Sequence, residues 1–180
     1  MKRHNRRSTR LENYDYSSGD AYYVTVCANN RESMFGDVRN GVMILNDIGK
    51  MVDRNWDQLP QRFPNIGLGE FITMPNHLHG IIIVGAPLVG AQNDIVGAQN
   101  ERAGILLGAS IRRRAFKSLT TNEYIRNVKD NNWPPFNKHI WQRNYYEHVI
   151  RNGIELNKIR EYIVNNPTHW EDDEEYVGNR

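Results

Sequence analysis

The sequence is poor in cysteine and has no long hydrophobic run. Cys27 is the single cysteine among 180 residues, so no internal disulfide can form and a disulfide-bonded secreted scaffold is excluded. The densest apolar run, Ile81–Val84, is far shorter than the roughly 20 residues with which a helix crosses a bilayer. Residues 1–10 are basic and no apolar stretch follows them, so no secretory signal is expected. These absences predict a cytoplasmic protein without a membrane partner.

The sequence also has little net charge, because its formal charge is only +2. Basic residues gather in the first ten positions and acidic residues occupy 171–175, which leaves the chain between them only mildly basic. A polyanionic partner must therefore be recognised by local clusters. The densest internal cluster consists of Arg112, Arg113, Arg114 and Lys117. Such a run also fits an ordinary solvated helix face.

The length and a hydrophobic content of 39% indicate one domain with an adequate core. We expect a basic arm over 1–20, a single domain over 21–170 and an acidic tail over 171–180. The pentapeptide Val-Gly-Ala-Gln-Asn occurs twice between positions 85 and 108. This stretch has too few large apolar groups to offset its ordering entropy, so it predicts a mobile insertion.

Hydrophobic periodicity and turn residues predict seven elements. In chain order they are a strand over Tyr22–Ala28, a helix over Asn46–Leu59 stopped by Pro60, strands over Ile66–Met74 and Leu78–Val84, a helix from Ser110 that restarts at Thr120–Glu123, an extended stretch over Ile140–Ile150, and a helix over Ile154–Asn166. The first six match the split βαβ plan of the ferredoxin-like α+β fold, an antiparallel sheet with helices on one face. The seventh adds a C-terminal helix.

His77 and His79 stand at the start of the most apolar predicted strand. Side chains at i and i+2 of a strand share a face, so both imidazoles can face one cation while Leu78 is buried opposite. Two histidines near a turn also fit a polar surface. A metal site needs at least a third ligand.

Tyr162 and Asn166 are four residues apart on the last predicted helix, so the phenol and the amide project from the same side. Taken alone, Tyr162 fits the edge of a core and Asn166 fits a helix end before Pro167. Together with the two histidines, they compose a metal site with a phenol close by. A divalent cation there can polarise a phosphoryl oxygen while the tyrosine attacks phosphorus.

Four segments resemble one enzyme family when they are taken in order. The metal motif is 74–80, Met-Pro-Asn-His-Leu-His-Gly, and it is followed by 116–118, Phe-Lys-Ser, by 140–152 and by 160–167, Arg-Glu-Tyr-Ile-Val-Asn-Asn-Pro. The set resembles the REP-associated tyrosine transposases, a branch of the single-tyrosine transposases of the HUH nuclease superfamily. The similarity runs from about residue 22 to residue 170.

The resemblance implies a metal-dependent enzyme that nicks and rejoins single-stranded or hairpin DNA at hairpin-forming repeats. His77 and His79 would be metal ligands, Tyr162 the nucleophile and Asn166 the third ligand. The tyrosine would attack a backbone phosphate, leave a 5′-phosphotyrosine and free a 3′-hydroxyl. The cofactor would be Mg²⁺ or Mn²⁺, and the protein would be a monomer or a homodimer.

Some assignments stay open on the sequence. The family's better-known members have glutamine where this chain has Asn166, and the shorter side chain requires a closer helix. Tyr145 is the rival nucleophile, and Glu147 or His148 is a rival ligand or base. Tyr162 is preferred because its partner one turn on can bind metal. Contacts to DNA are expected from seven residues, Arg112, Arg113, Arg114, Lys117, Arg143, Tyr145 and His148.

Two other functions fit the same residues. Ferredoxin-like sheets often bind RNA or single strands, so a non-catalytic nucleic-acid-binding module is the main alternative. The second is a zinc hydrolase that uses His77, His79 and a carboxylate.

Overall fold

The computed structural model describes residues 21–64, 66–84 and 109–177. The expected basic arm over 1–20, the expected insertion over 85–108 and the last three residues of the acidic tail lie outside the described residues. The elements in chain order are β1 (Ala21–Cys27), η1 (Asn29–Arg31), β2 (Gly36–Arg39), β3 (Val42–Leu45), α1 (Asp47–Asp57), α2 (Leu59–Arg62), β4 (Ile66–Thr73), β5 (His77–Val84), α4 (Ala109–Asp130), β6 (Tyr146–Ile150), α5 (Gly153–Asn165) and η2 (Asn166–Asp172).

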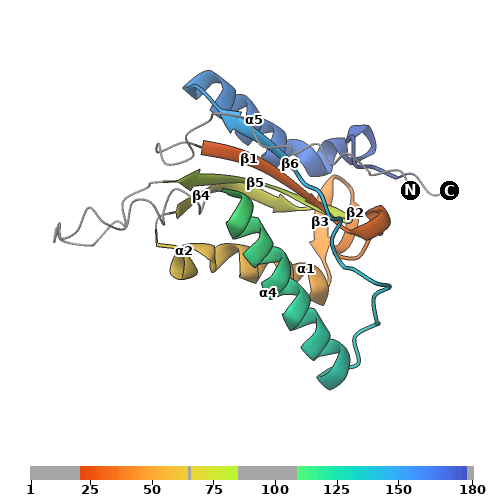
Figure 1. Cartoon of the computed structure of the whole chain (residues 1–180). Helices are drawn as coiled ribbons and strands as arrows, with labels where there is room; N and C mark the ends of the chain where they lie inside the picture. Colours follow the sequence, from red (N-terminus) through yellow and green to blue (C-terminus); the bar gives the residue numbers. More distant parts are fainter. Residues whose placement is uncertain (1–20, 65, 85–108, 178–180) are drawn as a thin grey trace, which may run out of the picture.

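The main sheet has the strand order β4-β5-β1-β6, and every neighbouring pair is antiparallel. Helices α1, α2 and α4 lie on one side of this sheet, and α5 with η2 lies on the other side (Figure 1). The predicted ferredoxin-like α+β fold with an added C-terminal helix is confirmed. None of the helices in the described ranges combines the length and the apolar character that crossing a membrane requires.

Local sequence explains most of the element boundaries. The Asn46 side chain accepts a hydrogen bond from Gly49 N at 2.9 Å and begins α1, as its N-cap position predicts. The turn between β4 and β5 is closed by a hydrogen bond from Met74 N to His77 O at 2.8 Å. This turn contains Pro75 and Asn76, which confirms the predicted hairpin.

Three predictions about boundaries were wrong. Pro60 does not stop the first helix, because α1 ends at Asp57 and Pro60 lies in the first turn of α2, where its missing N–H costs nothing. Helix α4 does not restart at Thr120, whose hydroxyl instead donates to Phe116 O at 2.8 Å. Only 146–150 of the stretch predicted as extended joins the sheet, while Trp141 makes an isolated bridge to Ala28.

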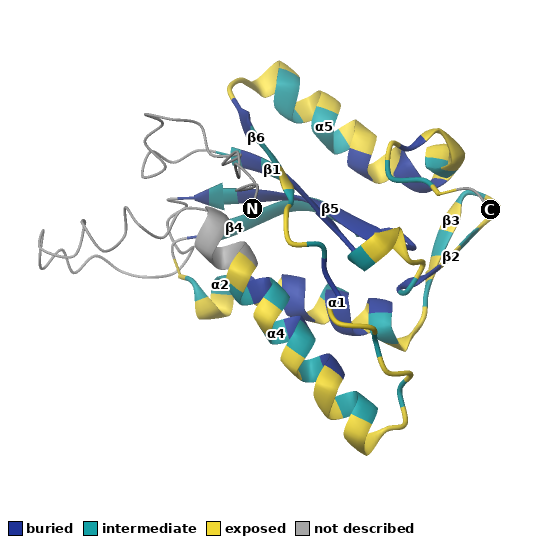
Figure 2. Cartoon of the chain, turned by 45° about the vertical axis from the view of Figure 1, so that its right-hand side comes forward, coloured by how far each residue is buried: buried dark blue, intermediate teal, exposed yellow. Residues whose placement is uncertain are grey.

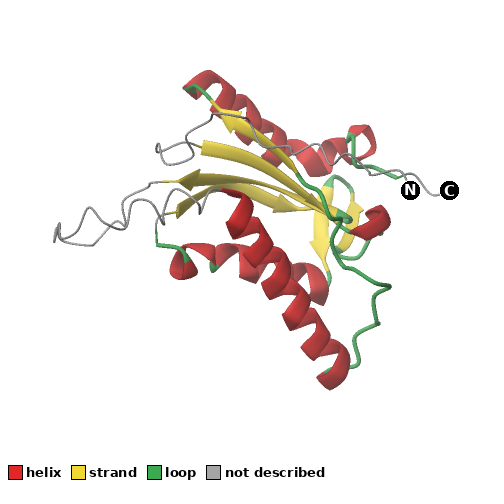
Figure 3. Cartoon of the chain, in the orientation of Figure 1, coloured by secondary structure: helices red, strands yellow, loops and turns green. Residues whose placement is uncertain are grey.

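The β2–β3 hairpin was not predicted, although its turn carries a recognisable signal. Asn40 and Gly41 both have positive φ, as a tight hairpin turn between two strands requires. The Asn-Gly pair was therefore a usable marker. Each strand has only four residues, which made the flanking pattern too short to read. Figure 3 shows the hairpin beside one end of the main sheet.

The main core lies between the sheet and the helices α1 and α4. Leu78 and Ile82 of β5 are fully buried there with Trp56 and Phe116. A Cβ at Gly80 would lie 2.3 Å from the Trp56 ring, so this glycine lets the ring approach the strand. Figure 2 shows the buried residues concentrated in the central strands and on the inner sides of these helices.

Candidate metal centre and nucleophile

The two histidines of β5 lie side by side on the face of the sheet that α5 covers. Their ring centroids are 4.3 Å apart, and His77 Nε2 is 2.9 Å from His79 Nε2. His77 is completely buried and His79 is nearly so. Leu78, between them, belongs to the main core on the opposite face. The sequence therefore placed these three side chains correctly relative to the sheet.

The other ring nitrogen of each histidine has a partner of its own. His77 Nδ1–H donates to Asn76 Oδ1 at 2.8 Å, which leaves the lone pair on Nε2. Burial, together with the neighbouring His79, lowers the pKa of His77 well below its ordinary value of 6.5, so the ring is neutral. A neutral imidazole with its lone pair on Nε2 is the form that binds a metal ion.

His79 Nδ1 is contacted by two hydroxyls of β1. Tyr23 OH is 2.7 Å away and Thr25 Oγ1 is 2.9 Å away. The register of the sheet causes this, because Thr25 stands directly opposite His79. When Nδ1–H donates to these oxygens, Nε2 carries the lone pair and faces the same point as Nε2 of His77. Outer partners of this kind fix the orientation of metal-binding imidazoles.

The side chain of Tyr162, on α5, also extends toward the two Nε2 atoms of His77 and His79. Its hydroxyl lies 3.4 Å from His79 Nε2 and donates to Asp173 Oδ2 at 2.6 Å. The side chain is 43% exposed, so an external substrate can reach it. Burial, reinforced by the Asp173 carboxylate, raises the pKa of the phenol well above its ordinary value of 10.0. The hydroxyl is therefore protonated in this arrangement.

Asp173 follows η2 and brings a carboxylate into the centre of the cluster. Its Oδ1 lies 3.9 Å from His77 Nε2, and its Oδ2 lies 3.5 Å from His79 Nε2. One possible ligand atom from each of these three residues lies within 4.8 Å of the others. Burial alone would raise the pKa of Asp173, but the nearby His79 ring and the hydrogen bonds from Tyr162 and Asn166 outweigh it and hold the pKa well below its usual range.

The sequence carried no signal for Asp173, because it is one of five consecutive acidic residues assigned to a tail. A 3₁₀ turn decides its position. Asn166 keeps helical angles although Pro167 follows, and η2 then turns the chain back toward the histidines. The C-terminal end of the described chain thus contributes to the site.

Asn166 lies one helical turn after Tyr162 and is 2% exposed. Its Nδ2 donates to Asp173 Oδ2 at 2.6 Å. Its Oδ1 is buried and has no hydrogen-bond partner among the described residues. A buried amide oxygen without a donor is costly, and a cation would satisfy it. The two Nε2 atoms and the Asp173 carboxylate lie close enough together to hold a metal ion, and the Asn166 amide lies beside this carboxylate.

A cavity of about 720 Å³ opens beside these groups and is lined by residues of β1, β5, β6, α5 and the stretch 172–175 at the end of η2 and after it. Tyr146, at its rim, is 58% exposed and packs edge to face against Tyr23. His148 also lines the cavity, where its Nε2 lies 2.6 Å from Glu155 Oε1. The cavity gives a substrate access to Tyr162.

The other residues predicted to contact DNA lie elsewhere. Arg112 and Arg113 belong to the first turns of α4, where side chains are described only from Arg114 onward, and Arg114 is exposed. Lys117 donates to Gln142 O at 2.7 Å and lies 5.7 Å from the Tyr145 ring centroid. Tyr145, the rival nucleophile, is therefore beside α4, and it does not line the cavity of Tyr162.

Comparisons with known proteins agree with this fold. No family model matches the chain. A solved REP-associated tyrosine transposase bound to a REP hairpin aligns with a TM-score of 0.56 and 20% identity, over 89% of this chain and 73% of that chain. This likeness shows a shared fold. A Haemophilus influenzae protein, described as uncharacterized, is 40% identical over 182 residues, 97% of this chain and 94% of that protein. The chain belongs to the same protein family as this Haemophilus influenzae protein.

Proposed function

We propose that the chain is a DNA transposase that nicks and rejoins single-stranded DNA at hairpin-forming repeats through a covalent 5′-phosphotyrosine on Tyr162. The observation that carries the proposal is the convergence of the Tyr162 hydroxyl with the Nε2 atoms of His77 and His79. The shared fold with a transposase bound to a REP hairpin supports the choice of DNA. The protein would act in the cytoplasm, as a monomer or a homodimer.

The metal would be held by His77, His79 and the orphan Oδ1 of Asn166, with Asp173 as an additional oxygen donor. Imidazole and oxygen ligands together suit Mn²⁺, and the oxygen donors also suit Mg²⁺. When bound, such a cation would neutralise charge on the phosphoryl oxygens and favour the ionised phenol. Two contacts support this role for the short side chain of Asn166: its amide donates to Asp173 at 2.6 Å, and α5 packs onto the sheet through Ile163.

Asp173 would orient the attacking oxygen, because the phenol donates to its carboxylate at 2.6 Å. This carboxylate is a weak base, since its pKa lies well below the usual range, so the phenol proton would pass to solvent water as the oxygen attacks. The Tyr162 oxygen forms a bond to phosphorus, the bond from phosphorus to the 3′ oxygen breaks, and that oxygen leaves as a 3′-hydroxyl after taking a proton. The energy of the phosphodiester is kept in the protein linkage, so attack by another 3′-hydroxyl restores DNA and frees the tyrosine.

One observation favours a second candidate, a metal-dependent hydrolase that uses water as its nucleophile. Asp173 supplies the carboxylate that such a site with two histidines requires. In that case Tyr162 would orient the substrate and no covalent product would form. A trapped adduct separates the two functions.

The test is a trapping experiment with a labelled hairpin DNA that carries single-stranded flanks, in the presence of Mn²⁺ or Mg²⁺. The wild-type chain should form a denaturant-resistant protein–DNA adduct. Tyr162→Phe should form none while its DNA affinity stays within about twofold, since only the attacking oxygen is removed. Tyr176→Phe is the matched control, because Tyr176 packs against Trp170 and its variant keeps the ring.

Three other outcomes of the trapping experiment would each support a different mechanism. An adduct with Tyr162→Phe that disappears with Tyr145→Phe would move the nucleophile to the rival tyrosine. Cleavage without any adduct would establish the hydrolase. Binding without cleavage across a panel of repeat hairpins would establish a non-catalytic binding module.

A further inference from the structure

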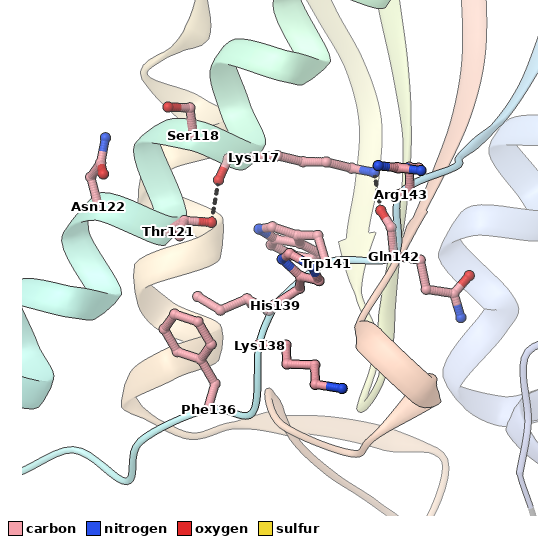
Figure 4. Close-up of a pocket in the computed structure, with 11 residues that line it drawn as sticks. Lys117, Ser118, Thr121, Asn122, Phe136, Lys138, His139, Trp141, Gln142 and Arg143 are labelled. Atoms are coloured by element: carbon pink, nitrogen blue, oxygen red, sulfur yellow. Dashed lines mark hydrogen bonds between the residues drawn. The ribbon is translucent and has the colours of Figure 1, made fainter.

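A second cavity lies beside α4 and shares no lining residue with the cavity of Tyr162. Its volume is about 370 Å³, within the usual size range of small-ligand sites. One wall is the helix face around Lys117 and Thr121, and the other is the irregular segment 136–143 (Figure 4). Residues 140–143 of this segment belong to the stretch predicted as extended over 140–150, and they lie outside the strand β6.

The cavity is positively charged. Three of its eleven lining residues are cations, namely Lys117, Lys138 and Arg143, and none of the eleven is Asp or Glu. Lys138 and Arg143 are exposed, and Lys117 extends from α4 toward Gln142 (Figure 4). Such a lining selects an anion through charge.

The walls of the cavity also suit a planar ring. Phe136 and Trp141 contribute aromatic surface, and hydroxyl and amide groups of Thr121 and Asn122 lie on the helix side. Trp141 is fixed in place, because it is nearly buried and its indole N–H donates to Thr120 Oγ1 at 2.8 Å. Aromatic surface with nearby polar groups and cations is how proteins hold unpaired bases and their phosphates.

We infer that this cavity binds one unpaired nucleotide of the DNA substrate, with the base against Phe136 and the phosphate at Lys138 and Arg143. The inference rests on the proposed function, which supplies DNA as the ligand. A hollow of this kind admits a base that is turned out of the stack, whereas a base inside a duplex cannot enter it. The cavity therefore recognises the single-stranded part of the substrate.

The backbone connects this cavity to the metal centre. Gln142 N, in the cavity wall, donates to Cys27 O at 2.9 Å, and Cys27 pairs with His77 in the sheet. Arg114, exposed one helical turn before Lys117, continues the line of cations along α4. Both sites therefore lie near the end of the sheet where Cys27 pairs with His77.

The test measures binding without cleavage, in EDTA, by fluorescence anisotropy. The probes are one labelled hairpin with a four-nucleotide single-stranded flank and the same hairpin with a blunt end. The full-length double variant Lys138→Ala with Arg143→Ala should bind the flanked hairpin on the order of tenfold more weakly and the blunt hairpin nearly as well as the wild type does. Lys50→Ala with Arg62→Ala removes the same charge from exposed positions on α1 and α2 and should change neither affinity.

A second variant separates the base from the phosphate. Phe136→Leu keeps the charge, so it should weaken binding of the flanked hairpin several-fold without changing the salt dependence, whereas the double cation variant should flatten it. Equal losses for the flanked and blunt hairpins, or wild-type affinity in all variants, would overturn the inference. The proposed function fails separately, when the wild-type chain with Mn²⁺ gives no adduct on the same flanked hairpin.

Discussion

The two faces of the central sheet bury different chemistry although the same strands supply both. The face toward α1 and α4 buries Leu78, Ile82 and Trp56 in a continuous apolar cluster. The face toward α5 has a smaller apolar cluster, centred on Ile81 and Ile163. Beside that cluster, five polar side chains converge, namely His77, His79, Tyr162, Asn166 and Asp173.

The difference teaches how this fold separates stability from function. An apolar contact gains free energy wherever it excludes water, while buried polar groups cost free energy unless each finds a partner. The α5 face meets that condition only in part, because Asn166 Oδ1 has no partner in the described chain. An unpartnered oxygen can gain a partner by binding a cation. The α1 and α4 face also buries an unpartnered group among the described residues, the indole N–H of Trp56, but an N–H group cannot bind a cation.

The largest expected effect is on the apolar face. Leu78→Ala should lower the free energy of unfolding by about 2–5 kcal/mol, because Leu78 is completely buried and its truncation leaves a cavity. Urea unfolding in EDTA measures this loss. The Mn²⁺ affinity of the folded variant, measured by calorimetry, should match the wild type. A loss of affinity as large as that of a ligand variant would show that the two faces are not separate.

The next effect is on the polar face. Asp173→Asn should reduce Mn²⁺ affinity by more than about 100-fold, since a direct ligand contributes more than the outer partners whose loss costs about 10–100-fold. Glu171→Gln is the control, because Glu171 is an exposed member of the same acidic run. Calorimetric titration with Mn²⁺ compares them. An unchanged affinity in Asp173→Asn would limit the metal site to the histidines and Asn166.

A smaller effect is expected from the outer partner of His79. Thr25→Val keeps the branched shape but removes the hydroxyl 2.9 Å from His79 Nδ1, so Mn²⁺ affinity should fall by about 10-fold, the lower end for such partners, while Tyr23 still contacts the ring. Thr25→Ser restores the hydroxyl and should recover the affinity. Calorimetric titration with Mn²⁺ compares the two variants. If Thr25→Val binds Mn²⁺ as tightly as Thr25→Ser does, Thr25 contributes only to packing.

How much of the site could be predicted depends on how far apart in the sequence the interacting residues lie. His77 and His79 share a face because alternation is a property of any strand, and Tyr162 and Asn166 share a side because their spacing matches one helical turn. The ferredoxin-like antiparallel plan also followed from the order of elements along the chain. By contrast, the Asn-Gly turn of β2–β3 was readable but its strands were too short, and nothing in the run 171–175 distinguished Asp173 from its neighbours.

The sequence by itself determined the ferredoxin-like order of elements and the pairing of chemical groups within each element, because both depend on local periodicity and turn residues. Only the tertiary structure decided that α5 crosses the sheet at the histidines and that η2 returns Asp173 to them. It also decided that 136–143 lines a basic cavity against α4, although 140–143 had been predicted as part of a strand. These contacts join segments far apart in the chain, and their positions depend on packing between faces, which no local pattern encodes.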